Sequence, residues 1–177
     1  MIIKLDVDGV LKDMVTPSIQ IYKEYYDSRD NTVYDDIKVY NMSIAMPGIT
    51  DFYKFFMEHG KYIFGEAKPY DGAVDFVKEL KKQGHTIAIT TNQIRGLEKY
   101  TIKWLQQYHI PYDSLHYSKD KSLIKGDLLI DDCIDNLLSC KDQEFVACFS
   151  QPWNQEWTGL RFNDYEQALS WTSTYNL

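Results

Sequence analysis

Two carboxylates, Asp6 and Asp8, stand directly after a short apolar segment at residues 2–5 and directly before Gly9. Strand-forming residues predict that this segment is a buried β-strand, and Gly9 permits a turn that a side chain would hinder. Two acidic groups at the end of a buried strand are costly unless a cation or hydrogen bonds compensate them. A surface Asp-x-Asp-Gly turn is the alternative, so the rest of the sequence must decide between the two.

Two further apolar segments also end in polar groups. Residues 85–90 lead to Thr90 and Thr91, and residues 128–130 lead to Asp131 and Asp132. Either pair alone could cap a helix or form a turn. In a doubly wound parallel sheet, however, ligands bind beyond the carboxyl ends of the strands. All three groups are therefore expected to converge on one site.

Four carboxylates at one site would repel one another without a cation. Their oxygens suit a hard divalent ion, and magnesium is usually held by a few carboxylates together with phosphate and water. Threonine hydroxyls and turn amides could bind a phosphate group, and a lysine could neutralise the remaining charge. Lys121, just before the third segment, is the best candidate, although a single loop lysine is more often solvated.

The elements around these segments predict an α/β fold. Apolar positions at helical spacing indicate helices over residues 71–83 and 97–108, with a last helix at about 164–173 that Asp164 or Asn163 caps. Short strands are expected at residues 114–117 and 145–149. Strands that are apolar throughout and alternate with helices indicate a parallel sheet covered on both faces.

Residues 14–68 interrupt this alternation. They are rich in Tyr and Phe and show helical patterns around residues 19–26 and 50–58. Because a loop of about 50 structureless residues is unusual inside a domain, we expect a small helical cap inserted after the first strand. The catalytic core would then comprise residues 1–13 and 69–177.

Composition excludes several classes of protein. The 177 residues suffice for one domain with an inserted subdomain. The net charge of −7 and the lack of a basic run argue against binding to a nucleic-acid polymer. Three cysteines without a Cys-x-x-Cys pair favour a reducing interior. No segment has the length of a membrane span or the features of a signal peptide, so a cytoplasmic location is expected.

The chain resembles the haloacid dehalogenase (HAD) superfamily. The segment from Asp6 to Val10, a threonine after the second strand, a later lysine and the segment from Ile130 to Asp132 are similar to its four motifs, in the same order. The resemblance implies a Rossmann-like core, Mg²⁺ as cofactor and phosphoryl transfer through an aspartyl-phosphate, a known covalent strategy.

A narrower resemblance is to the 5'(3')-deoxyribonucleotidases. It rests on four segments, residues 66–74, 118–122, 126–132 and 149–154. The cap shows no clear match, and Met14 stands where relatives often carry an aromatic residue, so base and sugar preference stay open. This resemblance implies a small phosphorylated substrate, a nucleoside monophosphate, and leaves a homodimer open.

The resemblance also implies a role for each site residue. Asp6 would be the nucleophile, and Asp8 would act as general acid and then as general base. The Asp6 carboxylate, the Asp8 backbone carbonyl and Asp132 would hold Mg²⁺, with Asp131 beside them orienting a metal-bound water. The phosphate would be bound by Thr90, Thr91 and Lys121.

Other functions are compatible with parts of this pattern. The same motifs serve phosphatases for sugar phosphates or nucleic-acid 3' ends, and a non-catalytic binding module could keep the fold. A hydrolytic dehalogenase is disfavoured because such enzymes lack the acid that Asp8 provides, and the complete motif set argues against a binding module. Four cap aromatics could stack on a base or simply pack the cap: Tyr40, Phe52, Tyr62 and Phe64.

Overall fold

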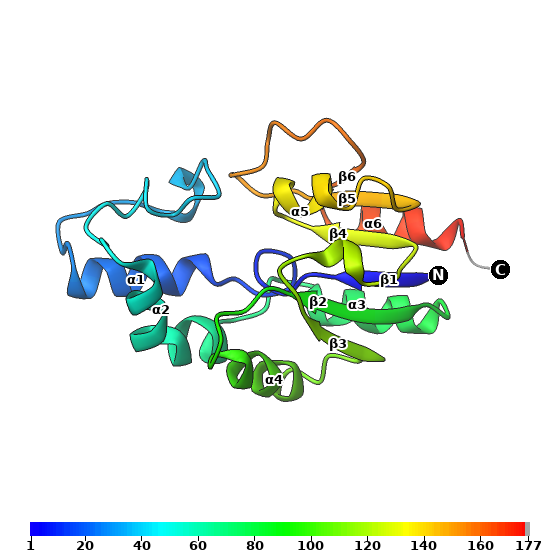
Figure 1. Cartoon of the computed structure of the whole chain (residues 1–177), viewed down its shortest axis with the longest axis horizontal. Coiled ribbons are helices and arrows are strands. Elements are labelled where there is room, and N and C mark those ends of the chain that lie inside the picture. Colours follow the sequence, from blue (N-terminus) through cyan, green and yellow to red (C-terminus); the bar gives the residue numbers. More distant parts are fainter. Residues whose placement is uncertain (176–177) are drawn as a thin grey trace.

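A six-stranded parallel sheet forms the centre of the protein, and a helical segment extends from one end of it (Figure 1). This computed structural model describes residues 1–175. The strands are β1 (Ile2–Leu5), β2 (Thr86–Thr91), β3 (Ser114–Tyr117), β4 (Leu128–Asp131), β5 (Phe145–Phe149) and β6 (Arg161–Phe162). Their order is β3-β2-β1-β4-β5-β6, and every neighbouring pair is parallel. The predicted α/β, Rossmann-like doubly wound fold is confirmed.

The helices follow the order that the sequence predicts, with additions. They are α1 (Val15–Tyr25), α2 (Phe52–Gly60), α3 (Ala73–Lys82), α4 (Glu98–Gln107), α5 (Ile134–Ser139) and α6 (Tyr165–Ser173), with short turns η1 (Tyr34–Asp36), η2 (Lys61–Glu66) and η3 (Lys121–Leu123). Asp164 caps α6 as predicted, because its side chain accepts a hydrogen bond from the Gln167 N–H at 2.8 Å. The two-residue β6 and the six-residue α5 were not predicted.

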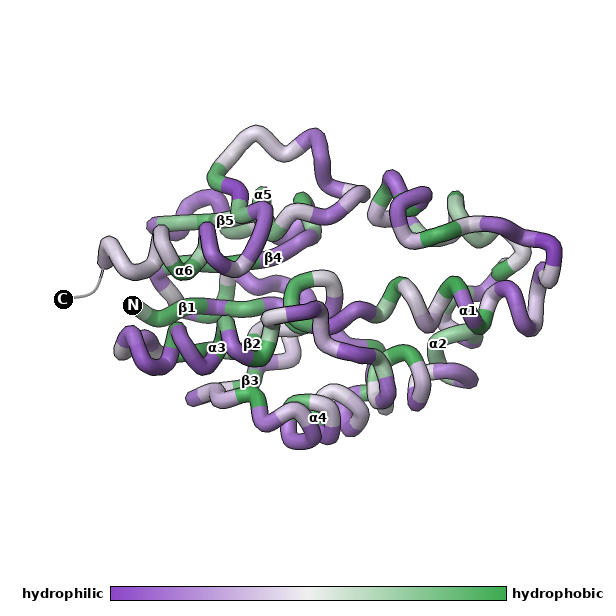
Figure 2. Tube along the Cα trace, turned by 180° about the vertical axis from the view of Figure 1, so that it is seen from behind, coloured by the Kyte–Doolittle hydropathy of each residue, from purple (hydrophilic) through white to green (hydrophobic). Residues whose placement is uncertain are grey.

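Each face of the sheet is covered. Side chains of α3, α4 and α6 pack on one face in the largest apolar cluster, which includes Leu5, Phe76, Trp104 and Ala168. The other face carries α5, where Leu129 packs against Leu137. Figure 2 shows this arrangement as mostly hydrophobic strands between helices of mixed polarity.

One buried residue departs from the apolar character expected of the first strand. Lys4 lies in the middle of β1 and is fully buried. Ile2, by contrast, is 39% exposed. The strand is therefore buried as predicted over three of its four residues, and one of those three is a lysine.

Residues 14–68, here called the cap segment, have an apolar cluster of their own. Its members include Ile19, Tyr22, Phe55 and Ile63, with Leu97 and Trp153 contributed from outside the segment. The two ends of the cap segment lie side by side where they join the sheet domain, since the Asp13 N–H donates to the Lys68 carbonyl at 3.0 Å. The division into core and cap at residues 13 and 69 stays a prediction. Within residues 1–175, no helix is long and apolar enough to cross a bilayer.

Candidate active site

The carboxylates that follow β1 and β4 lie together because these two strands are neighbours. Leu5 and Ile130 are in register, so Asp6 and Asp131 follow at the same level, and the Asp6 N–H donates to the Ile130 carbonyl at 3.1 Å. One oxygen from each of Asp6, Asp131 and Asp132 lies within 4.8 Å of the other two. These are two of the three strand ends that the sequence predicts to converge.

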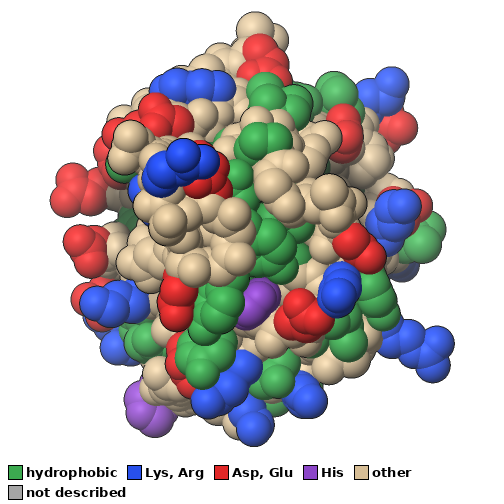
Figure 3. Space-filling view, turned by 90° about the vertical axis from the view of Figure 1, so that its left-hand side faces the viewer, with side chains coloured by type: hydrophobic (Ala, Val, Ile, Leu, Met, Phe, Trp, Pro, Cys, Tyr) green, Lys and Arg blue, Asp and Glu red, His purple; other side chains and the backbone are tan. Residues whose placement is uncertain are grey.

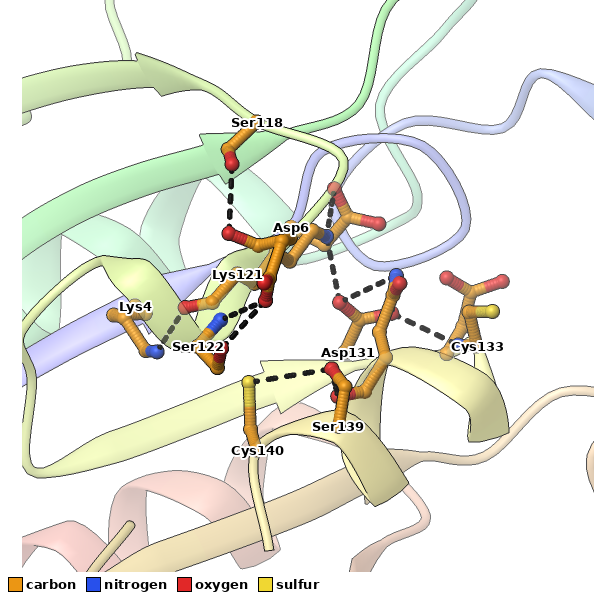
Figure 4. A network of polar contacts seen from close by, with 12 residues as sticks. Lys4, Asp6, Ser118, Lys121, Ser122, Asp131, Cys133, Ser139 and Cys140 are labelled. Atoms are coloured by element: carbon orange, nitrogen blue, oxygen red, sulfur yellow. Dashed lines mark hydrogen bonds and ion pairs between the residues drawn. The ribbon is translucent and has the colours of Figure 1, made fainter. Parts of the chain in front are cut away.

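Lys121 lies between two of these carboxylates. Its fully buried ammonium is 2.9 Å from Asp6 Oδ1 and 2.6 Å from Asp131 Oδ2 (Figure 4). Burial disfavours its charge, but Asp131 and Asp6 outweigh that effect and hold the pKa of Lys121 above its ordinary value. The lysine therefore stays charged and offsets part of the negative charge of the site.

The two adjacent aspartates differ in how many of their oxygens the protein already binds. Asp131 Oδ1 accepts from the Cys133 N–H at 2.9 Å and from Asn136 Nδ2 at 3.1 Å, while Oδ2 binds Lys121. Asp132 Oδ2 accepts from Trp153 Nε1 at 2.8 Å, but its buried Oδ1 has no hydrogen-bond partner among residues 1–175. The oxygens left for a cation belong to Asp132 and Asp6.

The ionised forms of these two carboxylates are disfavoured without a cation. Burial raises the pKa of Asp6 to about 7, against the opposing attraction of Lys121. Burial also raises the pKa of Asp132 well above its ordinary value, and the neighbouring charges of Asp131 and Asp6 add to the shift. A small, hard divalent cation fits this pair of oxygen donors.

Gly9 allows the loops after β1 and β4 to approach closely. Its φ of +83° lies in the left-handed region, and a Cβ at this position would overlap the carboxylate of Asp132. The glycine of the first acidic motif is therefore needed both for backbone conformation and for space.

Asp8 is held by two residues that sequence reasoning missed. Lys12 Nζ lies 3.2 Å from Asp8 Oδ1, fully buried and 4.9 Å from the centre of a Trp104 ring. Gln93 Nε2 donates to Asp8 Oδ2 at 3.1 Å and to Thr101 Oγ1 at 3.0 Å. Lys12 follows Asp8 by four residues and could have been suspected from that spacing, whereas no local pattern marks Gln93.

The two threonines at the end of β2 take different positions. Thr91 lines the cavity beside the carboxylates. Thr90 follows Ala88 by two residues, and Ala88 is in register with Lys4, so Thr90 lies on the same face of the sheet as Asp6. Its hydroxyl is buried and has no hydrogen-bond partner in the described part of the chain.

A cavity of about 960 Å³ opens above the carboxylates. Asp6, Asp8 and Asp132 line one end, and apolar side chains from the cap segment and its surroundings line another part: Ile37, Tyr40, Met42, Phe52, Phe56, Phe64 and Trp153. Tyr62, suggested above as a base contact, instead lines a separate depression beside α1 on the cap segment, so this suggestion does not fit the structure.

A chain of hydrogen bonds connects the cap segment to the first acidic motif. The Tyr34 hydroxyl of η1 contacts Gln151 Oε1 at 2.7 Å and the Tyr70 hydroxyl at 2.6 Å. Gln151 Nε2 in turn donates to the Gly9 carbonyl at 2.7 Å. The loop of residues 149–154 thus supports the site from one side, through Gln151 on Gly9 and through Trp153 on Asp132.

Comparisons with known proteins agree with this fold. The 5'(3')-deoxyribonucleotidase of Bacillus subtilis is 28% identical over 178 residues, covering 96% of this chain and 94% of its own length. A HAD family hydrolase from Deinococcus radiodurans with bound phosphate and sodium superposes with a TM-score of 0.69 at 11% identity, covering 98% and 95% of the two chains. The HAD-hydrolase YfnB of Bacillus subtilis, bound to magnesium, gives 0.59 at 14% identity and covers 95% and 96%.

The family comparison covers the whole sequence. A model of the family described as "5' nucleotidase, deoxy (Pyrimidine), cytosolic type C protein" matches residues 1–177. The chain therefore belongs to this family and is a HAD-type phosphatase of the 5'-nucleotidase kind.

Proposed function

We propose that this protein is a magnesium-dependent 5'(3')-deoxyribonucleotidase that forms an aspartyl-phosphate on Asp6. One observation carries the proposal: Asp6, Asp8 and Asp132 share one end of a cavity whose cap side is aromatic and apolar. The carboxylate end suits a phosphate with its cation, and the apolar side suits a nucleoside. The names of the relatives support the same substrate class.

In the first step, a carboxylate oxygen of Asp6 attacks the phosphorus, the bond between phosphorus and the ester oxygen breaks, and Asp8 donates a proton to that leaving oxygen. In the second, Asp8 removes a proton from the water that hydrolyses the phospho-aspartate. Gln93 and Lys12 hold the two oxygens of Asp8 in place for both transfers. Lys121 balances the charge between Asp6 and the phosphate, and Thr91, which lines the cavity, offers its hydroxyl group to a phosphate oxygen. The buried hydroxyl of Thr90, which has no partner among residues 1–175, would be a second donor.

The residues present fit the expected cofactor. The carboxylates of Asp6 and Asp132 and the backbone carbonyl of Asp8 would hold Mg²⁺, and Asp131 would stay bound to Lys121 and Asn136 beside them. When bound, Mg²⁺ polarises phosphoryl oxygens and offsets the charge of the transition state.

Phosphate release from a substrate panel tests the proposal. The panel contains deoxy- and ribonucleoside 5'- and 3'-monophosphates, several sugar phosphates and p-nitrophenyl phosphate, each assayed with Mg²⁺ and with EDTA. We expect the highest kcat/KM for a deoxynucleoside monophosphate, and no turnover in EDTA. A lead for a sugar phosphate would contradict the substrate class, and undiminished turnover in EDTA would contradict the metal dependence. A cytoplasmic location and a homodimer stay predictions.

A further inference from the structure

We propose that Lys4 is a positioning residue that holds the η3 turn so that the ammonium of Lys121 lies between Asp6 and Asp131. The inference rests on the proposed function, because Lys121 matters only if Asp6 takes up a phosphoryl group. It concerns a residue of the strand interior that lies outside the acidic, threonine and lysine motifs of the site.

A lysine in the middle of the central strand is costly, because its ammonium is removed from water. Lys4 is fully buried. It precedes Asp6 by two residues, so both side chains leave β1 on the same face of the sheet. On that face the Lys4 side chain reaches the turn that carries Lys121.

The ammonium of Lys4 connects the two ends of this turn. It donates to the backbone carbonyl of Lys121 at 2.8 Å and to that of Ile124 at 3.0 Å (Figure 4 shows the first contact). These carbonyls stand at the first residue of η3 and at the residue directly after it. Lys4 therefore fixes the backbone of Lys121, while Asp6 and Asp131 bind its side-chain end.

The exposed side of the turn adds little to this support. Leu123 in η3 is 77% exposed and adds little packing. The side chain of Asp120 caps the turn by accepting from the Ser122 N–H at 3.0 Å, but it is exposed to solvent. The two bonds from Lys4 thus anchor the backbone of η3, while the ion pairs of Lys121 anchor only its side chain.

Gly126 provides space for the Lys4 side chain. A Cβ at Gly126 would lie 2.7 Å from Lys4 Cγ and 3.0 Å from Cδ. Gly126 is not among the glycines with positive φ. Its position therefore needs a glycine because a side chain would not fit, and not because of the backbone conformation. Gly126, which stands two residues before β4, therefore leaves the room that the lysine in β1 needs.

A double-mutant cycle tests whether Lys4 acts through Lys121. Lys4→Met keeps most of the volume and removes the donor. We expect it to lower kcat by about tenfold or more, since misplacing a group by about 1 Å can cost about 10²-fold. In a Lys121→Met background the same change should lower kcat less than about twofold, because the group that Lys4 positions is then gone. KM should change less than kcat, because the apolar side of the cavity is untouched.

Ile3→Ala is the matched control, since Ile3 is also buried in β1 but packs in the cluster on the opposite face. It should lower the melting temperature while leaving kcat unchanged at temperatures well below melting. If Lys4→Met does not fold, Gly126→Ala takes its place, because a Cβ there displaces the Lys4 stem without removing its charge. It should give the same dependence on Lys121.

An equal loss of kcat in both backgrounds, or no loss at all, would overturn the role of Lys4 and leave the phosphatase activity standing. A wild-type protein that releases no phosphate from any member of the panel would instead overturn the proposed function, and this inference with it.

Discussion

At the scale of single residues, two adjacent carboxylates of the site differ in how many of their oxygens already accept hydrogen bonds from the protein. Asp131 and Asp132 are adjacent in sequence and both buried, yet only Asp131 has both oxygens bound by donors from the described protein. Such hydrogen bonds orient a carboxylate and fix what it can still bind. Asp131 therefore stays bound to Lys121, while Asp132 keeps an oxygen that can bind a cation.

The sequence could place these residues together but could not assign their partners. The strand-end argument brought Asp6 near Asp131 and Asp132, because parallel strands share an edge. It could not have found Trp153 on Asp132 or Gln93 on Asp8, since these hydrogen bonds span 21 and 85 residues of sequence. Long-range side-chain contacts leave no periodicity in a sequence.

Trp153→Phe should weaken Mg²⁺ binding. The change removes the N–H that orients Asp132 and keeps the aromatic bulk, and loss of such a supporting contact typically costs about 10–100-fold in metal affinity or activity. Titration of phosphatase activity with Mg²⁺ measures the effect. Trp157→Phe is the control, because this indole donates to the Leu160 carbonyl at 2.9 Å, away from the carboxylates. Equal Mg²⁺ dependence in both variants would contradict the assignment.

Asp6→Asn should abolish turnover while leaving the fold intact. An amide cannot serve as the nucleophile, and loss of a nucleophile lowers kcat by about 10⁴-fold or more. Because ionised Asp6 is disfavoured in the metal-free protein, the variant should melt no lower than the wild type at pH 8 in EDTA. Activity close to wild type in a folded variant would mean that another residue attacks phosphorus.

At the scale of elements, regular segments were predictable and short ones were not. The strands β1, β3 and β5 lie where their apolar patterns place them, and α3, α4 and α6 lie within one or two residues of the predicted ranges. The missed elements, α5 and β6, have six and two residues. Segments this short hold too few residues for a helical or alternating pattern to stand out.

One hydroxyl group of the cap segment, that of Tyr34, makes two hydrogen bonds to residues of the core. Tyr34→Phe removes the bonds to Gln151 and Tyr70, whose net value is about 1 kcal/mol. For a chain of this size that predicts a melting temperature about 2–4 °C lower. The ratio of kcat/KM for a deoxynucleotide to that for p-nitrophenyl phosphate should also fall, because the cap segment lines the apolar part of the cavity, where we propose that the nucleoside binds.

Tyr53→Phe is the matched control for this change. Tyr53 lies on α2 of the cap segment and is 62% exposed, so neither the melting temperature nor the substrate ratio should change. A Tyr34→Phe variant with an unchanged substrate ratio would mean that the position of the cap segment does not depend on this contact.

At the scale of the whole molecule, the two ends differ in where their charged side chains lie. Lys12 and Lys121 are fully buried beside the carboxylates with which they pair. Lys4 is also fully buried, but it binds backbone carbonyls instead. The end of the molecule formed by the cap segment shows hydrophobic side chains in a band between charged ones (Figure 3). Exposed aromatic and apolar residues of the cap segment include Tyr25, Ile44, Tyr53 and Tyr62. Which lysines are buried and which aromatic residues are exposed depends on the fold and cannot be read from total composition.

Without Mg²⁺, the stability of the whole protein should fall as pH rises, and Mg²⁺ should offset this fall. Asp6 has a pKa of about 7 in the folded protein against about 4 in an unfolded chain. Below about pH 4 both states hold the proton, so the folded state loses nothing. Between about pH 4 and 7 the unfolded chain releases the proton while the folded protein keeps it, so stability falls as pH rises, and above about pH 7 the loss is complete. Asp132 shifts in the same direction.

Melting temperatures between about pH 4.5 and 8.5 measure this effect. In EDTA the wild type should melt lower as pH rises, and Asp6→Asn should flatten that dependence because it removes one of the two titrating groups. Since a metal binds the ionised carboxylates and releases their protons, added Mg²⁺ should raise the melting temperature more at pH 8.5 than at pH 6. Stabilisation by Mg²⁺ that is equal at both pH values would mean that the cation does not bind through Asp6 and Asp132, and the metal site would have to be sought elsewhere in the cavity.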